Sequence, residues 1–254
     1  MTRRLEASKA LITGASSGIG AATARALAGQ GAAVAIVARR KERLDQLTQE
    51  IGAAGGRALP IEADITDQAQ AVAAVKRAAD EFGGLDIVVN NAGVMLLGPA
   101  VDAPTAEWDQ MVRINLLGLL YVTHAALPHL LAAAESGPRR VADLVNVSSV
   151  AGRVTRVGSG VYNLTKHGVG AFSDSLRQEV TRRHVRVSVI EPGAVATELA
   201  THLRPEILAQ MRQRLGNVEM MQAEDIADAI EYIVSRPRHV AINELLIRPT
   251  EQEF

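Results

Sequence analysis

The sequence predicts an α/β fold: a doubly wound parallel sheet of seven strands with helices on both faces. Short apolar runs alternate with amphipathic stretches along the chain, as in KALIT (9–13), IGAATARALAGQG (19–31) and AAVAIVA (32–38). The strand-like runs are apolar throughout, which is typical of strands buried on both faces of a parallel sheet. No linker rich in Pro, Gly or Ser divides the chain and no repeat is visible. Residues 1–254 are therefore expected to form a single domain.

The remaining elements follow in the same alternating order. Helices that end at glycine are expected over 41–56 and 68–84, because Gly favours the backbone angles that stop a helix. The other expected elements are strands 57–64, 85–93, 141–149, 185–193 and 243–250, and helices 105–134, 162–183 and 223–236.

Two segments are not assigned to this alternation. Residues 132–140 (AAAESGPRR) are expected to form a surface loop. Residues 198–222 contain three methionines and are expected to be a mobile lid over a substrate, since flexible methionines suit an adaptable apolar pocket. The same methionines would also suit ordinary helix packing.

Composition excludes several classes of function. The net charge is −1, so no basic excess indicates binding to nucleic acid or to an anionic membrane. The chain has no Cys, which excludes disulfides, thiolate metal sites and a cysteine nucleophile. The six histidines show no metal-ligand spacing, and no apolar run reaches the roughly 20 residues of a membrane helix. A cytoplasmic protein without a metal is expected.

The motif TGASSGIG (13–20) stands between the first strand and the first helix. Gly14 allows a tight turn, Gly18 allows a diphosphate to approach the backbone, and Gly20 allows helix and strand to pack closely. The helix N-terminus presents unpaired N–H groups to a phosphate. A glycine-rich turn without a ligand is the alternative, but the flanking strand and helix favour nucleotide binding. The motif also places Ser16, Ser17 and Ile19 at the nucleotide.

The end of the second strand selects the cofactor. Here an acidic residue would bind a ribose 2′-hydroxyl, whereas arginine accommodates a 2′-phosphate. The sequence reads ARRKERL, with Arg39 and Arg40 and no acidic residue before Glu42. A guanidinium offers a planar fork to phosphate, so NADP(H) is predicted. Alternatively, both arginines are solvated charges at the start of a helix.

Tyr162 and Lys166 lie one helical turn apart in VYNLTKHG (161–168). Side chains at i and i+4 project from one helix face, and a nearby ammonium is expected to lower the pKa of a phenol from about 10. The pair would then act as a general acid or base on a carbonyl or alcohol. A packed Tyr beside a solvated Lys is the alternative. Ser149, thirteen residues before Tyr162 at a strand end, favours catalysis.

These motifs together resemble the classical short-chain dehydrogenase/reductase superfamily. The G-x-x-x-G-x-G loop, NNAG (90–93), the Ser149–Tyr162–Lys166 set and Pro-Gly followed by Thr197 stand in the family's order and spacing. The resemblance covers nearly the whole chain. It implies a single-domain Rossmann fold, NADP(H), a small-molecule carbonyl substrate, and a homotetramer or homodimer.

The resemblance also implies roles for single residues. Ser149 would hydrogen-bond the substrate oxygen, Lys166 would hold the nicotinamide ribose, and Asn115 would anchor a water for proton relay unless it is an ordinary helix residue. The loop EPGAVATEL (191–199) would cradle the nicotinamide. Further expected cofactor contacts are Asp64, Ile65, Asn91, Ala92, Gly93, Tyr162, Pro192, Gly193, Val195 and Thr197.

The ending AINELLIRPTEQEF lacks the V-D-G-G common among fatty-acid-type ketoreductases. The chain is more similar to the branches of clavulanic acid dehydrogenases and of NADP-dependent 3-hydroxy acid and serine dehydrogenase-like reductases. An NADPH-dependent aldehyde or ketone reductase is therefore expected. An alcohol or 3-hydroxy acid dehydrogenase, an imine reductase and a non-catalytic dinucleotide-binding regulator stay as alternatives.

A few further side chains could face a substrate. Arg153 and Arg156 could meet an acidic substrate, although exposed loop charges are the favoured interpretation. Met95 could line the cleft, and Trp108 is expected to pack at a helix start.

Overall fold

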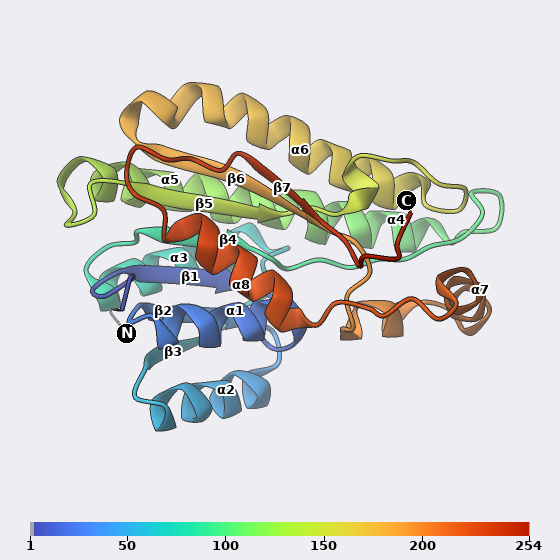
Figure 1. The fold of residues 1–254 in the computed structure, drawn as a ribbon, viewed down its shortest axis with the longest axis horizontal. Helices are drawn as coiled ribbons and strands as arrows, with labels where there is room; N and C mark the ends of the chain where they lie inside the picture. Colours follow the sequence, from blue (N-terminus) through green and yellow to red (C-terminus); the bar gives the residue numbers. More distant parts are fainter. Residues whose placement is uncertain (1–2, 254) are drawn as a thin grey trace.

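The computed structural model describes residues 3–253 and contains a sheet of seven parallel strands in the order β3-β2-β1-β4-β5-β6-β7 (Figure 1). This order continues the 3-2-1-4-5-6 arrangement of dinucleotide-binding sheets by one strand. The predicted α/β class and strand number are confirmed. The strands are β1 (Lys9–Thr13), β2 (Ala33–Ala38), β3 (Arg57–Glu62), β4 (Ile87–Asn90), β5 (Ala142–Val147), β6 (Val185–Pro192) and β7 (Glu244–Ile247).

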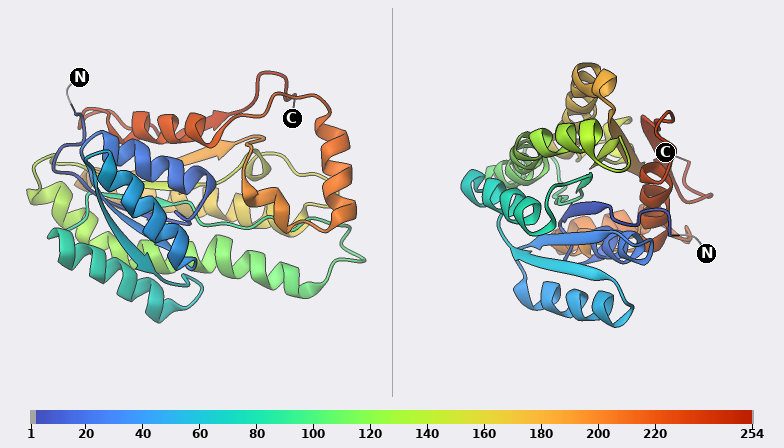
Figure 2. Two further views of the ribbon diagram at one scale, coloured as in Figure 1. Left: turned by 90° about the horizontal axis from the view of Figure 1, so that it is seen from below. Right: turned by 90° about the vertical axis from the view of Figure 1, so that its left-hand side faces the viewer.

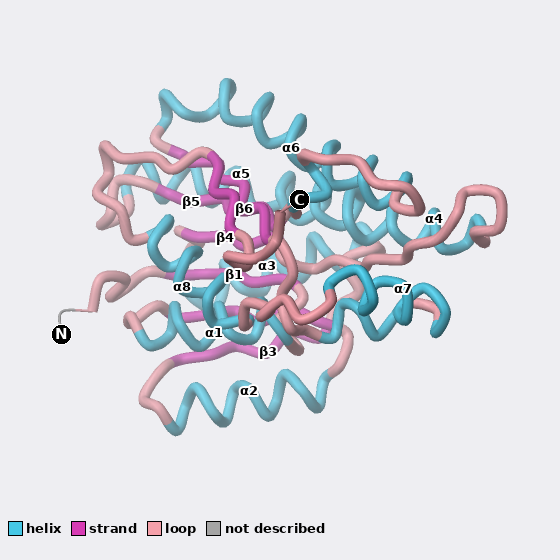
Figure 3. Tube along the Cα trace, turned by 45° about the vertical axis from the view of Figure 1, so that its right-hand side comes forward, coloured by secondary structure: helices cyan, strands magenta, loops and turns pink. Residues whose placement is uncertain are grey.

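Helices cover both faces of the sheet (Figures 2 and 3). One face carries α1 (Gly18–Gly29), α2 (Lys41–Ala53) and α8 (Ala223–Val234). The other carries α3 (Gln68–Phe82), α5 (Leu119–Ser136) and α6 (Gly160–Val180). Each expected helix between two strands therefore exists, with ends shifted by a few residues.

Alternate residues of each strand enter opposite cores. In β1, Leu11 packs with the α3, α5 and α6 side chains, whereas Ile12 packs with those of α1, α2 and α8. Val88 and Val89 of β4 divide in the same way, and all four side chains are fully buried. Both faces of the strand lose water, so an apolar residue is favoured at every position.

The expected helix 105–134 is a composite of three segments. It runs through α4 (Thr105–Val112), a π-helical stretch η1 (Arg113–Gly118) and α5. Within residues 3–253, this continuous helix is long and apolar enough to span a membrane by length and composition, which corrects the expectation that no apolar run reaches that length. A core helix meets the same criterion, and α5 packs against α3, β4 and β5.

The structure corrects the expected surface loop and gives the secondary structure of the segment 198–222. Residues 132–136 belong to α5, so the surface loop of 132–140 shrinks to the turn after Ser136. The segment 198–222 contains a 3₁₀ turn, η4 (Glu198–His202), and a helix, α7 (Pro205–Leu215), which projects beyond the sheet at the right of Figure 1. Two more 3₁₀ turns are η2 (Val150–Gly152) and η3 (Thr181–Arg183).

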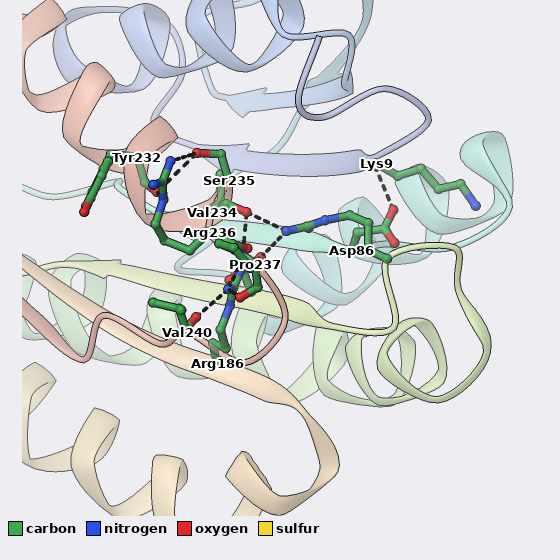
Figure 4. A network of polar contacts seen from close by, with 11 residues as sticks. Lys9, Asp86, Arg186, Tyr232, Val234, Ser235, Arg236, Pro237 and Val240 are labelled. Atoms are coloured by element: carbon green, nitrogen blue, oxygen red, sulfur yellow. Dashed lines mark hydrogen bonds and ion pairs between the residues drawn. The ribbon is translucent and has the colours of Figure 1, made fainter. Parts of the chain in front are cut away.

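A buried charge network ties together the amino ends of the strands (Figure 4). Arg186 in β6 is 6% exposed and donates twice to Asp143 of β5, at 2.7 and 3.0 Å. Its remaining donors reach backbone carbonyls after α8, including those of Val234, Pro237 and Val240. Arg139 supplies a second cation to Asp143 at 2.9 Å. The guanidinium of Arg186 therefore holds the α8–β7 connection onto the sheet.

We predict that Arg186→Met lowers the free energy of unfolding by about 3 kcal/mol, because it leaves a buried carboxylate and several carbonyls short of partners. Chemical denaturation measures this loss. Arg25→Met removes a similar charge from the exposed Arg25–Glu50 pair and should cost at most about 1 kcal/mol. Equal losses in the two variants would contradict the structural role of Arg186.

Candidate functional site

The carboxyl ends of the parallel strands border a cavity of about 1570 Å³. This volume exceeds the roughly 300–1,000 Å³ of a drug-sized pocket. Of the predicted site residues, only Gly20 and Asn115 do not line it. The lining set is Gly14, Ser16, Ser17, Gly18, Ile19, Arg39, Arg40, Asp64, Ile65, Asn91, Ala92, Gly93, Ser149, Tyr162, Lys166, Pro192, Gly193, Val195 and Thr197.

The glycine loop lies against two other segments of the cavity wall. Gly14 has φ +66°, and a Cβ there would lie 2.7 Å from the Cα of Ala92. Gly18 has φ +52° and faces the Thr197 side chain, which a Cβ would approach to 3.1 Å. A side chain at either position would push these segments apart, so glycine is required for close approach. Gly20 is buried in α1, as its predicted packing role requires.

Asn91 braces the ends of β1 and β4. Its Nδ2 donates to the carbonyls of Thr13 and Gly14, at 3.0 and 3.3 Å. Its backbone N–H and that of Ala92 both donate to Thr13 Oγ1 at 3.1 Å. Asn91 therefore holds the carboxyl ends of β1 and β4 together beside the cavity.

The two arginines after β2 have different environments. Arg39 is exposed at the cavity wall, and no hydrogen bond or ion pair of its side chain is present among residues 3–253. Arg40 donates to Ser16 Oγ at 3.0 Å, to Ser17 Oγ at 2.8 Å and to Glu198 at 2.9 Å. Arg39 can therefore take an anionic ligand directly, whereas Arg40 supports the glycine loop.

Asp64 and Ile65 lie on the wall next to this region. Asp64 Oδ1 accepts hydrogen bonds from the backbone N–H and the hydroxyl of Thr66, at 3.0 and 2.8 Å. Ile65 is 8% exposed and packs against Gly118 of η1. These contacts hold the turn after β3 at the cavity.

Ser149, Tyr162 and Lys166 meet at the cavity. Lys166 Nζ donates to the carbonyl of Val147 at 2.9 Å and lies 5.8 Å from the centre of the Tyr162 ring. Ser149 Oγ lies 3.4 Å from the Pro192 carbonyl and accepts from Ala151 N–H at 3.1 Å. The two residues of the helix and the serine of the strand end therefore face one space.

The electrostatics of this set differ from the expectation. Burial raises the pKa of Tyr162 to about 12, and the hydrogen bond with Ser149 only partly offsets that rise. Burial also lowers the pKa of Lys166 to about 8. The prediction that the phenol has a lowered pKa is wrong for this structure, because desolvation raises the pKa and only the hydrogen bond with Ser149 acts against it. At neutral pH the phenol is protonated, as an unperturbed phenol with a pKa of about 10 also is.

Asn115 lies behind the cavity wall within η1. Its side chain exchanges hydrogen bonds with the backbone of Val94, at 2.8 and 2.9 Å, and donates to Thr165 Oγ1 at 3.2 Å. A Cβ on Gly93 would lie 3.4 Å from Asn115 Oδ1 and 3.7 Å from Lys166 Nζ. Asn115 therefore fixes the segment after β4 beside the lysine.

Residues 193–197, the β6 loop, form another part of the cavity wall, and they meet the glycine loop at Thr197. Gly193 N–H donates to the Ile247 carbonyl at 2.8 Å, and Val195 forms a parallel bridge with Met221. Thr197 caps η4, its Oγ1 accepting from Leu199 N–H at 3.4 Å. Pro192 ends β6 directly before the loop.

Arg153 is exposed, as the favoured interpretation expects, but its guanidinium is bound to carboxylates of the protein itself and not to a substrate. Its Nε donates to both oxygens of Glu191, at 2.7 and 2.9 Å, and it also pairs with Glu244. Glu191 is 3% exposed, so the ion pair compensates a buried charge and links the Ser149 turn to β6. Arg156 lines the cavity, so an anionic substrate stays a possible contact for it.

Beyond Tyr162, the wall is largely apolar. Val94, Met111 and Tyr162 form a small core, with Met95 and the predicted helix residue Trp108 packed against it.

Sequence reasoning missed Gly98, whose loop meets the Arg204 side chain of the lid segment, and the residues Glu251, Gln252 and Glu253. The last three could have been found, because they follow the carboxyl end of the last parallel strand.

The sequence was compared with known protein families and proteins. A family model described as short chain dehydrogenase matches residues 8–208. Glycine betaine reductase ATRR of Emericella nidulans is 37% identical over 243 residues, which are 96% of this chain but only 19% of that protein. An uncharacterized oxidoreductase of Staphylococcus epidermidis (strain ATCC 35984) is 35% identical over 240 residues, covering 94% of this chain and 96% of that protein.

Solved structures share the whole fold. The closed form of serine dehydrogenase complexed with NADP⁺ superimposes with a TM-score of 0.87 and 32% identity, covering 96% of both chains. A short chain dehydrogenase from Burkholderia cenocepacia in complex with NADP gives a TM-score of 0.83 and 30% identity, covering 97% of this chain and 98% of that one. A 3-ketoacyl-(acyl-carrier-protein) reductase from Brucella melitensis complexed with NADH gives 0.86 and 31%, with coverage of 97% and 98%.

The buried lysine predicts a pH-dependent stability. Because its folded pKa is lowered from 10.5 to about 8, the folded protein binds fewer protons than the unfolded chain between these values. The stability of the wild type should therefore rise with pH across this window, by roughly 3 kcal/mol, relative to Lys166→Met. Denaturation of both proteins from pH 7 to pH 10.5 measures the difference. If the stabilities of the wild type and of Lys166→Met changed with pH in parallel, the lowered pKa of Lys166 would be contradicted.

Proposed function

The chain belongs to the short-chain dehydrogenase family, and on that premise we propose that it is an NADPH-dependent reductase of aldehydes or ketones. The observation that carries the proposal is the convergence of Ser149, Tyr162 and Lys166 on the cavity that the glycine loop borders. A proton donor and a nucleotide-binding loop thereby share one space.

The residues fit a dinucleotide phosphate cofactor. Glycines at 14 and 18 let the glycine loop pack against the segments after β4 and β6, beside the N-terminus of α1, where N–H groups favour a diphosphate. Arg39 would hold the 2′-phosphate, and the glycine loop would hold the diphosphate. Lys166 and the β6 loop would hold the nicotinamide end. Relatives crystallised with NADP or NADP⁺ support this choice.

Tyr162 is the general acid of the proposed reaction. When bound, the cofactor supplies a hydride to the carbonyl carbon. The phenol, which is protonated at neutral pH, gives its proton to the carbonyl oxygen, and Ser149 donates a hydrogen bond to the same oxygen. The ammonium of Lys166, 5.8 Å from the centre of the Tyr162 ring, would stabilise the phenolate that remains after the proton is transferred.

A second candidate is oxidation of a 3-hydroxy acid, favoured by the likeness to serine dehydrogenase. The same three side chains serve this direction, with the tyrosine accepting the proton. An imine reductase would likewise use this set. Arg156 at the cavity offers a guanidinium to a substrate carboxylate, and the apolar wall around Met95 suits an uncharged carbonyl compound.

The lid and the assembly are part of the proposal. Residues 198–222 would close over the substrate, since Ile207, Leu208 and Met211 of α7 line the cavity.

Only 33% of the apolar window in the helix of Thr105–Ser136 is buried within one chain. We propose that a second copy covers this surface in a cytoplasmic homotetramer or homodimer.

Oxidation of NADPH by the purified protein is expected with one class among aldehydes, β-keto esters, cyclic ketones and imines. Serine and other 3-hydroxy acids with NADP⁺ test the reverse direction.

Tyr162→Phe should lower kcat by about 10²–10⁴-fold, because it removes the proton donor, while NADPH binding by fluorescence titration stays unchanged. Turnover retained in this variant would overturn the proposed role. NADPH binding without turnover across the panel would favour a non-catalytic dinucleotide-binding regulator.

Cofactor choice should depend on Arg39. Arg39→Ala is expected to raise the KM for NADPH by about 10–100-fold and to leave the KM for NADH almost unchanged, because only NADPH carries the 2′-phosphate. Steady-state kinetics with both cofactors measure this. Arg40→Ala is the comparison variant, and it should weaken both cofactors because Arg40 holds Ser16 and Ser17. An equal change for both cofactors in Arg39→Ala would refute the assignment.

A further inference from the structure

A segment beyond β7 folds back over the catalytic edge of the sheet. We call residues 248–253 the strap. It turns on itself, with Gln252 N–H donating to the Pro249 carbonyl at 3.0 Å and Arg248 donating to the Glu253 carbonyl at 2.9 Å. Glu251, Gln252 and Glu253 line the main cavity. The strap therefore forms part of the wall of the site.

Gln252 binds the backbone of the β6 loop. Its Oε1 accepts a hydrogen bond from Ala194 N–H at 2.8 Å. The preceding residue, Gly193, leaves room for this contact, because a Cβ there would collide with Gln252 Oε1 and lie 3.0 Å from Arg248 Cγ. The strap and the loop are thus fitted to each other at one polar and one steric contact.

The other side of the β6 loop is held by the end of the lid segment. Met221 N–H donates to the Ala194 carbonyl at 3.2 Å, and Ala196 N–H donates to the Met221 carbonyl at 2.8 Å. Glu251 of the strap accepts from Glu219 N–H at 3.2 Å, just before Met221. The loop therefore lies between the strap and the lid segment, and the strap contacts both.

We propose that Gln252 is a positioning residue that sets the β6 loop for the nicotinamide, an inference that rests on the proposed function. Loss of its hydrogen bond leaves Ala194 N–H without a protein acceptor and frees one side of the loop. A misplaced loop moves the nicotinamide end relative to Tyr162, and a displacement of about 1 Å can cost up to roughly 10²-fold in rate. Gln252 acts through the loop and takes no part in proton transfer.

The kinetic test compares three variants. Gln252→Ala should raise the Kd for NADPH by about 5–20-fold and lower kcat about 10-fold, since the loop is no longer fixed. Gln252→Glu keeps the acceptor oxygen and should restore most of both quantities. Gln178→Ala makes the same change on the exposed part of α6 and should match the wild type. Fluorescence titration gives Kd apart from turnover.

A cofactor-free test addresses the contact itself. Gly193→Ala should lower Tm by about 2–4 °C in the wild-type background, because its methyl displaces the flexible end of Gln252 and breaks the hydrogen bond with Ala194 N–H. In the Gln252→Ala background the same change should lower Tm by less than half as much. Additive shifts in Tm would show that the two residues do not meet, and would overturn the proposal.

The proposed function and the positioning role of Gln252 are tested separately. A wild type that binds neither NADPH nor NADH would refute the proposed function, and the double-mutant comparison of Tm would still decide the contact. A wild type that binds NADPH, with Gln252→Ala equal to it in Kd and kcat, would overturn the positioning role alone. Loss of binding in both Gln252→Ala and Gln252→Glu would also overturn it, because the acceptor oxygen would then be irrelevant.

Discussion

Parallel pairing of the seven strands is the constraint on which the site depends, because it brings every strand's carboxyl end to one edge. Thr13, Asn90, Val147 and Pro192 end their strands there, and each precedes a segment that lines the cavity. The close contact of Gly14 with Ala92 then draws two of these segments together. At the opposite edge, Arg186 ties the amino ends to the α8–β7 connection. The charge network of Arg186 and the cavity therefore lie at opposite ends of the strands.

Burial rather than charge attraction dominates the electrostatics of Tyr162 and Lys166, the proposed catalytic pair. Tyr162 and Lys166 are both nearly inaccessible, and each has its charged form disfavoured by desolvation. A protonated phenol is the form a general acid needs, whereas a charged lysine is held at a cost in stability. The hydrogen bond from Lys166 to the Val147 carbonyl offsets part of that cost and orients the amine. Burial of the Lys166 ammonium therefore lowers the stability of the protein, and it accompanies a protonated Tyr162 phenol that is shielded from water.

Basic side chains around the cavity divide into binding and supporting roles. Arg39 is exposed at the wall, whereas Arg40 and Arg153 are bound to Ser17 and Glu191 within the chain. The Glu191–Arg153 pair fixes the end of β6, and the Gln252–Ala194 contact fixes the start of the β6 loop that follows. An arginine near an active site therefore reveals its role only through its partners. The strap supplies a support that the fold's strand order alone does not provide.

The sequence by itself determined the α/β class, the seven strands, the glycine loop and the grouping of serine, tyrosine and lysine. The class and the strands depend on local periodicity, and the pairing of Tyr162 with Lys166 depends on spacing within one helix. Ser149 lies on a different element, and it was grouped with them through the family's motif spacing. The tertiary structure decided the rest. The π-helical stretch at Asn115, the partners of Arg153, the raised pKa of Tyr162 and the contact between Gln252 and Ala194 arise between distant segments. Burial and long-range contacts set them, and neither quantity is encoded in the spacing of neighbouring residues.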